Sequence, residues 1–201
     1  MFTVFLVDDD VKVVKALSRL LRGRGYDVAV STSPQEFLDD HDATVPGCAV
    51  LDLSMPGLDG LELQQALTAR GAARPIIFLT GRGDIPTTVR AMRAGAVDFL
   101  TKPVAVVDLV AAIERAKEAD LLFRQSQAES SAVESRIATL TPRERQVLTQ
   151  IVSGKLNKQI AYELGTVEKT IKFHRGSLMK KLGVRMVADL VRLADKAGIT
   201  K

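Results

Sequence analysis

The apolar residues between residue 2 and about residue 118 form short runs that alternate with helical patterns. The runs predict strands near residues 2–7, 27–31, 47–52, 75–80 and 97–101. The amphipathic stretches between them predict helices near residues 11–23, 34–40, 59–70, 84–94 and 105–119. This alternation is typical of an α/β domain, here a doubly wound parallel sheet of five strands.

Local signals mark several ends of these elements. Ser33-Pro34-Gln35-Glu36 offers a capping Ser, a Pro at the first helical position and a Glu that can turn back to the cap. Gly25, Gly71 and Gly95 follow helical patterns, where a left-handed backbone favours glycine.

The stretch from residue 104 to residue 138 has no glycine and no internal proline and is rich in Ala, Glu, Arg and Gln, so the last helix can continue as a linker. A 4-3 spacing runs through it, at Leu109, Ala112, Ala116, Ala119, Phe123, Ser126, Ser130, Val133, Ile137 and Leu140. Sustained spacing of this kind can mean a coiled coil, but Ser126 and Ser130 weaken the seam. A coiled coil and a frayed helix both remain open here.

After the linker the pattern becomes entirely helical. Thr141 is the expected N-cap of one helix, with Pro142 in its first turn and Glu144 completing a capping box. Two short helical patterns then follow, separated by Gly165-Thr166. Their expected inner faces are Ile160, Ala161 and Leu164, and Ile171, His174, Leu178 and Leu182. The prediction is a compact all-helical bundle of about 60 residues.

Charge separates these two parts of the 201-residue chain. Residues 1–120 have a net charge of −4, residues 121–139 are neutral, and residues 140–201 have a net charge of +8. A basic module suits nucleic acid as a partner. There is no signal peptide and no run of about 18 apolar residues, so we expect neither secretion nor a membrane span. The single cysteine, Cys48, cannot form an internal disulfide and fits a reducing cytoplasm.

Carboxylates follow two of the predicted strands. Asp8, Asp9 and Asp10 come after the first run, and Asp52 comes after the third. If these strands are parallel neighbours, the acids meet at one edge of the sheet, repel one another and raise one another's pKa, which a bound cation would relieve. Oxygen ligands alone suit Mg²⁺.

Two more strands end in polar groups, Thr80 and Lys102. An accessible Asp52 beside Mg²⁺ can attack phosphorus and become an acyl phosphate. Lys102 would neutralise the transferred oxygens and Thr80 would donate a hydrogen bond to one of them. Pro103 makes a cis peptide possible.

Four motifs together resemble the receiver domain of bacterial two-component response regulators. They are Leu6-Val7-Asp8-Asp9-Asp10, Val50-Leu51-Asp52-Leu53-Ser54-Met55-Pro56-Gly57, Leu79-Thr80-Gly81 and Phe99-Leu100-Thr101-Lys102-Pro103. The resemblance implies that Asp52 accepts a phosphoryl group from a sensor histidine kinase. It implies Asp9, Asp52 and the Ser54 backbone carbonyl as Mg²⁺ ligands, with Asp8 acting largely through water, and Thr80 and Phe99 as a switch pair.

An enzymatic alternative also fits the first motif. Asp8 to Asp10 match the DxD opening of haloacid dehalogenase-like phosphatases, in which Asp8 would be the nucleophile and Asp10 the general acid. That pattern has Thr or Val where this chain has Lys12, and it needs a later acidic pair that this chain lacks after Lys102. It also leaves the motif at Asp52 unexplained. We therefore expect a protein that is not an enzyme.

The basic module has one cationic helical face. Lys169, Lys172 and Arg175 recur every three residues, and Lys180 and Lys181 lie further along. Such a helix can enter the major groove while its neighbours bind phosphates. Leu140–Leu148, Asn157–Ala161 and Thr170–His174 are similar to the LuxR-type helix-turn-helix.

That second resemblance distributes the expected DNA contacts. It puts Lys172, Phe173 and Gly176 nearest the bases, and Asn157, Lys158, Lys169, Thr170 and Arg175 nearer the phosphates. The family commonly has an apolar residue and then Ser where this chain has Thr166-Val167, so the side-chain cap can be lost or shifted.

The whole chain thus resembles a regulator of the FixJ/NarL family, with a CheY-like receiver at residues 1–118, a helical linker at 119–138 and a LuxR-type domain at 139–201 that includes a helix-turn-helix at about 156–175. We expect a cytoplasmic, phosphorylation-regulated transcription regulator that binds double-stranded DNA as a homodimer when phosphorylated, with RNA polymerase as a further partner. A DNA-binding protein whose receiver-like half works without phosphate is the alternative. The complete set of Asp8, Asp9, Asp52, Thr80 and Lys102 argues against it.

Overall fold

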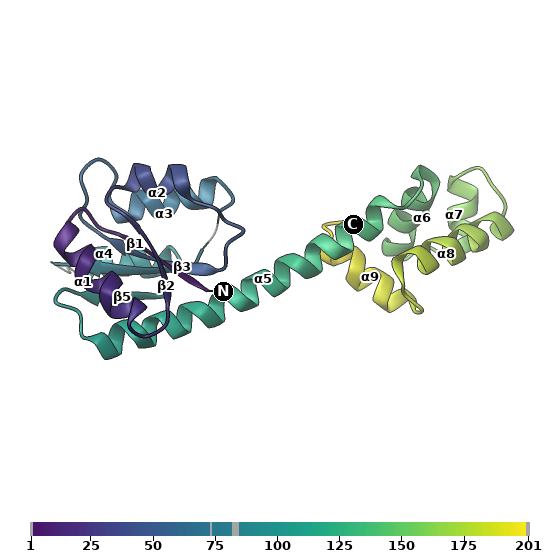
Figure 1. Ribbon diagram of the computed structural model, residues 1–201. Coiled ribbons are helices and arrows are strands. Elements are labelled where there is room, and N and C mark those ends of the chain that lie inside the picture. The colour runs from purple at the N-terminus through teal and green to yellow at the C-terminus, as the bar shows by residue number, and fades with distance from the viewer. Residues whose placement is uncertain (1, 73, 82–84, 200–201) are drawn as a thin grey trace. The chain divides into compact units, whose positions relative to one another are not determined.

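A computed structural model describes residues 2–72, 74–81 and 85–199. The chain divides into two compact units, Met1–Phe123 and Arg124–Lys201 (Figure 1). The expected helix start at residue 84 and the outermost residues of the chain lie outside the described residues. In the described part, none of the helices has both the length and the apolar character that crossing a bilayer demands.

The first unit contains a parallel sheet of five strands in the order β2-β1-β3-β4-β5, which confirms the predicted fold class. The strands are β1 (Thr3–Val7), β2 (Asp27–Ser31), β3 (Gly47–Asp52), β4 (Ile76–Thr80) and β5 (Asp98–Thr101). Every strand begins and ends within one residue of its predicted bounds. The register pairs Val7 with Leu51, Asp52 with Leu79, and Thr80 with Thr101, so the carboxyl ends of β1, β3, β4 and β5 meet at one edge of the sheet.

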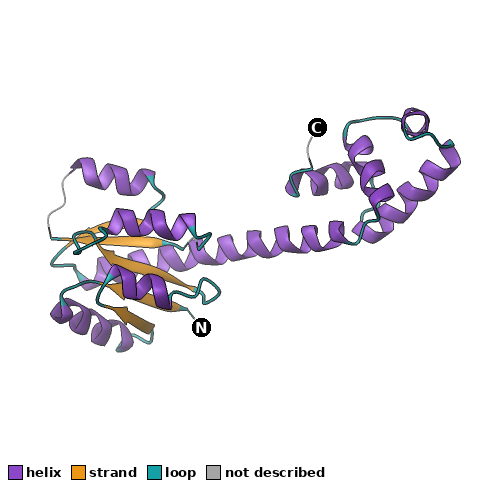
Figure 2. Cartoon of the chain, turned by 90° about the horizontal axis from the view of Figure 1, so that it is seen from above, coloured by secondary structure: helices purple, strands orange, loops and turns teal. Residues whose placement is uncertain are grey.

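Helices cover both faces of this sheet (Figure 2). They are α1 (Val11–Arg22), α2 (Pro34–Asp40), α3 (Gly60–Ala69), α4 (Ile85–Arg93) and α5 (Val106–Ala138). Leu21 of α1 and Ile113 of α5 belong to the core on one face, whereas Phe37 of α2 and Leu63 of α3 belong to the core on the other. This is the doubly wound arrangement that the alternating pattern predicts.

The predicted caps are present, with one difference. Ser33 caps α2 by accepting a hydrogen bond from the Glu36 N–H. The Glu36 carboxylate, however, accepts from the backbone N–H of Thr32 at 2.6 Å, so the return contact lies one residue before the cap. Gly25 and Gly95 adopt the left-handed backbone predicted for them, with φ of 86° and 88°.

Cys48 lies in the centre of the sheet. It is fully buried in β3, and burial raises the pKa of its thiol to about 12. The thiol is therefore protonated at neutral pH and has no access to solvent, in keeping with a purely structural cysteine.

One helix, α5, runs through the stretch that the sequence predicts to be a helical linker. Its seam residues Leu109, Ala112 and Ala116 are buried in the core of the first unit. Ile137, in its last turn, is buried in the core of the second unit. The two ends of α5 therefore each belong to one of the cores.

The second unit is all-helical, as predicted, with α6 (Pro142–Val152), α7 (Asn157–Glu163), α8 (Glu168–Leu182) and α9 (Val187–Lys196). Most of the predicted inner faces lie in its core, where Ile160, Ile171 and Leu178 are fully buried. His174 is only half-buried, and its ring lies edge-on to Phe173 at 5.8 Å. It therefore flanks the core and is not part of it.

Candidate functional site

Five polar residues meet at the carboxyl edge of the sheet, and we call them the carboxylate rim: Asp8, Asp9, Asp52, Thr80 and Lys102. Asp8 and Asp52 are 4% and 5% exposed, whereas Asp9 is exposed to solvent. One carboxylate oxygen from each of the three aspartates lies within 4.8 Å of the others. The predicted meeting of strand-end acids therefore occurs in the structure.

Lys102 bridges the two buried aspartates. Its Nζ lies 2.5 Å from Asp8 Oδ2 and 2.7 Å from Asp52 Oδ1. The Lys102 N–H donates to the carbonyl of Thr80 at 2.7 Å, and the Lys102–Pro103 peptide is cis. The lysine thus neutralises part of the rim.

The pKa values of two rim residues, Asp8 and Lys102, are both raised above their ordinary values. Burial raises the pKa of Asp8, outweighing the hydrogen bonds from Lys102 and from the Asp10 N–H that lower it. Burial alone would lower the pKa of Lys102, but the hydrogen bonds to Asp52 and Asp8 raise it overall. Asp8 is therefore a carboxylate with less compensation than its burial requires.

The donor set of the rim fits Mg²⁺. Three carboxylates face one lysine, all the available donors are oxygens, and the raised pKa of Asp8 marks a place where added positive charge is favourable. The backbone N–H of Ser54 donates to Asp52 Oδ2 at 3.1 Å, so the Ser54 backbone lies against this carboxylate. Asp10 is not part of the set, because its side chain caps α1 by accepting from the Lys12 N–H.

The loop after Asp52 packs closely beneath the rim. Asp59 and Glu62 form a capping box that begins α3 directly after this loop. Gly60 is required there, because a Cβ at this position would lie 2.6 Å from the carbonyl oxygen of Asp52. The close approach of the α3 N-terminus fixes the backbone of the residue that carries the central carboxylate.

Thr80 and Phe99 lie on the neighbouring strands β4 and β5. Thr80 is 1% exposed at the end of β4. Phe99 is half-buried, pairs in register with Phe78 and has its ring 6.3 Å from that of Phe78.

The expected DNA-contact residues lie on α7 and α8. Lys169, Lys172, Gly176 and Lys180 are exposed, and the ring of Phe173 is 72% exposed. Lys172 forms an ion pair with Glu168 at 3.0 Å on the helix surface. The N-cap of α8 is Val167, which provides no side-chain cap, so of the two expected outcomes, a lost or a shifted cap, the structure shows the loss.

Two of the other residues expected to contact DNA interact with side chains of the protein itself. Arg175 donates to the side-chain oxygen of Asn157 at 3.0 Å, which ties α8 to α7. Lys181 forms an ion pair with the buried Glu144 of α6 at 2.7 Å. Sequence reasoning identifies Glu144 as a capping residue but misses this ion pair, because nothing local connects residues 37 positions apart.

Comparison with known proteins agrees with both units. Residues 4–114 match the response regulator receiver domain, and residues 138–194 match the bacterial regulatory proteins of the luxR family. The chain belongs to the response regulators with a LuxR-type output domain. The match of residues 4–114 decides against the haloacid dehalogenase alternative for the same motifs.

Individual relatives of this response regulator extend over almost the whole chain. Nodulation protein W of Bradyrhizobium diazoefficiens is 43% identical over 197 residues, which are 98% of this chain and 87% of that protein. The solved structure of the response regulator StyR is 46% identical with a TM-score of 0.81, covering 97% and 98% of the two chains. Full-length FixJ from B. japonicum is 38% identical with a TM-score of 0.58, covering 99% and 98%.

The response regulator is therefore a phosphorylation-regulated transcription regulator of a two-component system. Its receiver implies a histidine kinase as partner, and its LuxR-type domain implies DNA binding.

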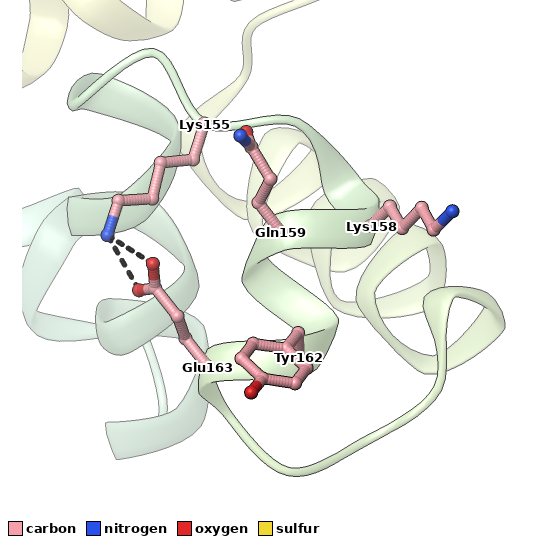
Figure 3. A pocket seen from close by; sticks show the side chains of 5 residues that line it. All are labelled: Lys155, Lys158, Gln159, Tyr162 and Glu163. Atoms are coloured by element: carbon pink, nitrogen blue, oxygen red, sulfur yellow. Dashed lines mark hydrogen bonds and ion pairs between the residues drawn. The ribbon is translucent and has the colours of Figure 1, made fainter.

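The response regulator has a further surface along α7 and the segment just before it (Figure 3). Lys155, Lys158, Gln159, Tyr162 and Glu163 line an open hollow of about 380 Å³. The Lys155 Nζ contacts both carboxylate oxygens of Glu163, at 2.7 and 2.6 Å. Tyr162 is 89% exposed.

Proposed function

We propose that Asp52 is the residue that accepts the phosphoryl group. The observation that carries the proposal is the meeting of three carboxylates with a lysine that bridges two of them. Asp52 ends a fully buried strand, and its two oxygens are oriented by Lys102 and by the Ser54 N–H. In the transfer, a carboxylate oxygen of Asp52 forms the new bond to phosphorus, and the electron pair of the broken P–N bond stays with the imidazole of the kinase.

Asp8, Asp9, Asp52 and the backbone carbonyl of Ser54 are the residues that would hold Mg²⁺. When bound, the ion supplies charge neutralisation for the phosphoryl oxygens. Lys102 is close enough to Asp52 to contact an oxygen of the transferred group, and the Thr80 hydroxyl would donate to another. We propose that Thr80 and Phe99 then change position together, which alters the surface beyond β4 and β5.

To test the phosphorylation site, the full chain is incubated with Mg²⁺ and acetyl phosphate, and the acid-labile phosphate is followed by a mobility shift on a phosphate-affinity gel. We expect phosphorylation of the wild type and none of Asp52→Asn. Asp39→Asn, an exposed acid on α2, is the matched control and should be phosphorylated normally. Phosphate on Asp52→Asn, or none on the wild type, would refute the assignment.

We propose domain boundaries at residues 1–118 for the receiver, 119–138 for the helical linker and 139–201 for the DNA-binding domain, with the helix-turn-helix at about 156–175. The contact set proposed for DNA is Asn157, Lys158, Lys169, Thr170, Lys172, Phe173, Arg175, Gly176, Lys180 and Lys181. The cationic surface of α8 supports this proposal. DNA affinity measured with and without acetyl phosphate separates it from phosphate-independent regulation, which predicts equal affinities.

The phosphorylated form is proposed to be a homodimer through the surface around residues 84–118. Large apolar side chains are exposed on α4 and at the start of α5, since Ile85 is 80%, Val89 42%, Met92 45% and Val107 78% exposed. Exposed apolar side chains that recur at helical spacing, as on α4, are typical of a protein interface. Ile85→Asp should leave Asp52 able to be phosphorylated while lowering the dimer fraction in analytical ultracentrifugation. An unchanged dimer fraction would move the interface elsewhere.

RNA polymerase is the further partner that we propose, in the cytoplasm, at the exposed face of α7. Glu163 neutralises Lys155 and would repel phosphates, so the part of this face around Glu163 and Tyr162 is poorly suited to DNA, whereas Lys158 stays in the DNA-contact set. Tyr162, 89% exposed, instead offers the aromatic area that protein interfaces favour. At saturating regulator, Tyr162→Ala should change transcription from a target promoter while DNA affinity stays the same. A parallel loss of DNA affinity would assign the face to DNA.

A further inference from the structure

Three side chains of the second unit form a cluster between α6 and α8, which we call the Glu144 cluster: Glu144, Ser177 and Lys181. Glu144 is 3% exposed, and yet it is charged. Hydrogen bonds from Lys181, Ser177 and Thr141 outweigh the opposing effect of burial and lower the pKa of Glu144 to about 2. The carboxylate therefore stays ionised throughout the physiological range.

The hydrogen bonds of Glu144 connect three parts of the unit. Its Oε2 accepts from the Thr141 N–H at 2.8 Å, at the start of α6. Its Oε1 accepts from the Ser177 hydroxyl at 2.7 Å, and Oε2 also accepts from Lys181 Nζ at 2.7 Å, both on α8. Lys181 Nζ donates in addition to the carbonyl of Thr139 at 3.3 Å, immediately after α5 ends. The end of the linker helix and the cationic helix are thus joined through one carboxylate.

The ion pairs of the α8 lysines differ in how much free energy it would cost to break them so that the lysine could contact DNA. The Lys172–Glu168 pair lies on the surface, with side chains 65% and 45% exposed, so water can solvate Glu168 if Lys172 turns to a phosphate. In the Lys181–Glu144 pair the Glu144 side chain is only 4% exposed. If Lys181 turned to a phosphate, it would leave a buried carboxylate without its cation, which is strongly unfavourable. Lys180, which is exposed, forms no ion pair in the described part of the chain.

We infer that Lys181 is a positioning residue and not a phosphate contact: the Glu144 cluster sets where α8 lies relative to the end of the linker helix. Its neighbour Lys180 is then the one of the two that contacts a phosphate. The inference rests on the proposed use of α8 for DNA binding and replaces the role that charge alone assigns to Lys181. It also gives Ser177 a role that the sequence does not suggest.

The first test counts phosphate contacts through salt dependence. The full chain, treated with acetyl phosphate and Mg²⁺, is titrated with a non-specific duplex at several salt concentrations. Each phosphate contact contributes about 0.9 to the slope of log affinity against log salt. Lys180→Met should reduce the slope by about 0.9, whereas Lys181→Met should leave it unchanged. A reduction of about 0.9 in Lys181→Met would overturn the inference.

The second test does not depend on DNA. Peptide-resolved hydrogen exchange of the full chain should show faster exchange in α8 for Lys181→Met and for the milder Ser177→Ala, and no change for Lys180→Met. The double variant Ser177→Ala/Lys181→Met should exchange less than the two single effects predict if added, because the side chains share one carboxylate. Unchanged exchange in both single variants would overturn the inference even if DNA binding by α8 is correct.

The third test separates positioning from stability. A duplex selected by the full chain from a random pool provides a specific site. Loss of folded α8 alone would lower specific and non-specific affinity by the same factor, whereas a displaced α8 loses base contacts first. We expect Ser177→Ala to lower specific affinity at least about 3-fold more than non-specific affinity. Equal losses would reduce the cluster to a structural role and overturn the inference.

Discussion

The receiver and the DNA-binding domain each contain a lysine bound to buried carboxylate, and the two clusters differ in balance. In the carboxylate rim, Lys102 bridges Asp8 and Asp52 beside a third acid, Asp9. In the Glu144 cluster, Lys181 faces one carboxylate whose other hydrogen bonds come from neutral donors. The pKa of Asp8 is raised, whereas the pKa of Glu144 is lowered to about 2.

The carboxylate rim is therefore a site whose charge can change, whereas the Glu144 cluster is a site that holds helices in place. The surplus negative charge of the rim is unfavourable without a bound cation. Binding of a cation is therefore favourable there, and the charge of the site can change during a reaction. The Glu144 cluster is already compensated, and any change of charge there is unfavourable. Similar residues therefore support opposite roles, and the balance of partners decides which.

The largest effect is expected from removal of the lysine at the rim. Lys102→Met should slow phosphorylation by acetyl phosphate about 100-fold to 1,000-fold, because a preorganised cation no longer faces the phosphoryl oxygens. Mg²⁺ binding, followed by calorimetry, should persist, since the carboxylates remain and Lys102 no longer competes for them. Lys117→Met, on the exposed surface of α5, is the matched control. A Lys102→Met variant with wild-type rates would remove Lys102 from the reaction.

Removal of the carboxylate in the Glu144 cluster should unfold the second unit more easily. Glu144→Ala leaves Lys181 and Ser177 without their acceptor, and we expect a loss of about 2 kcal/mol in the free energy of unfolding from the lost charge-assisted hydrogen bonds. The measurement is urea unfolding of the full chain followed by amide NMR signals of residues 139–199. Glu168→Ala, which breaks only the surface pair with Lys172, should cost no more than about 0.5 kcal/mol.

The pH dependence gives an independent check on Glu144. Its pKa in the folded protein lies below the ordinary value, so its contribution is fully present above the ordinary value of about 4.5 and is lost as pH falls toward about 2. Wild type and Glu144→Ala should therefore differ by a constant amount at neutral pH and converge in acid. A difference that does not depend on pH would mean that the charge of Glu144 contributes nothing.

Asp8→Asn should change the free energy of unfolding in the opposite direction to Glu144→Ala, because it should stabilise the protein. Because burial raises the pKa of Asp8, the ionised form costs stability, and without Mg²⁺ the variant should be more stable than the wild type at pH 7. Stability from the protonated form is present at low pH and lost as pH rises through the raised pKa, so the advantage of the variant should disappear in acid. Urea unfolding of the receiver signals tests this, and a less stable variant at pH 7 would contradict it.

The smallest effect concerns the first turn of α8. Val167 occupies the N-cap with an extended backbone, φ −99° and ψ 152°, but its side chain has no atom that can accept a hydrogen bond from the helix N–H groups. Val167→Ser supplies an acceptor, and we expect the second unit to gain about 0.5–1 kcal/mol in free energy of unfolding. Thr141→Ala, which removes the existing cap of α6, should cost a similar amount in the same measurement. No gain from the new Ser would indicate that its hydroxyl cannot reach the helix N–H groups.

The sequence predicts the sheet and the rim well because both depend on short-range signals. Apolar runs bounded by polar residues locate each strand within one residue. Asp8 directly follows β1, and Asp52 and Thr80 end β3 and β4, so the parallel strands bring these residues to one edge. The caps at Ser33 and Thr141 follow from tetrapeptides.

Pairings between distant helices could not be predicted in the same way. Charge and spacing place Lys181 on the cationic face with Lys172, but its ion pair with Glu144 depends on how α6 packs against α8. The bridge from Lys102 to both Asp8 and Asp52 likewise depends on the tertiary structure, because a lysine side chain has many rotamers. Even a local contact differs from the prediction. The Glu36 carboxylate accepts from the backbone N–H of Thr32 and not from that of the N-cap Ser33, because the path of the chain between β2 and α2 decides which N–H is within reach.

The burial of Cys48 has a practical consequence for measuring the switch. Since its thiol has a pKa of about 12 and no exposed surface, maleimide dyes should not label the native protein. Cysteines introduced at exposed positions, for instance Gln35 on α2 and Arg192 on α9, would then be the labelled ones. Fluorescence energy transfer between two such dyes would follow the separation of the receiver and the DNA-binding domain in real time as the receiver gains and loses its phosphoryl group.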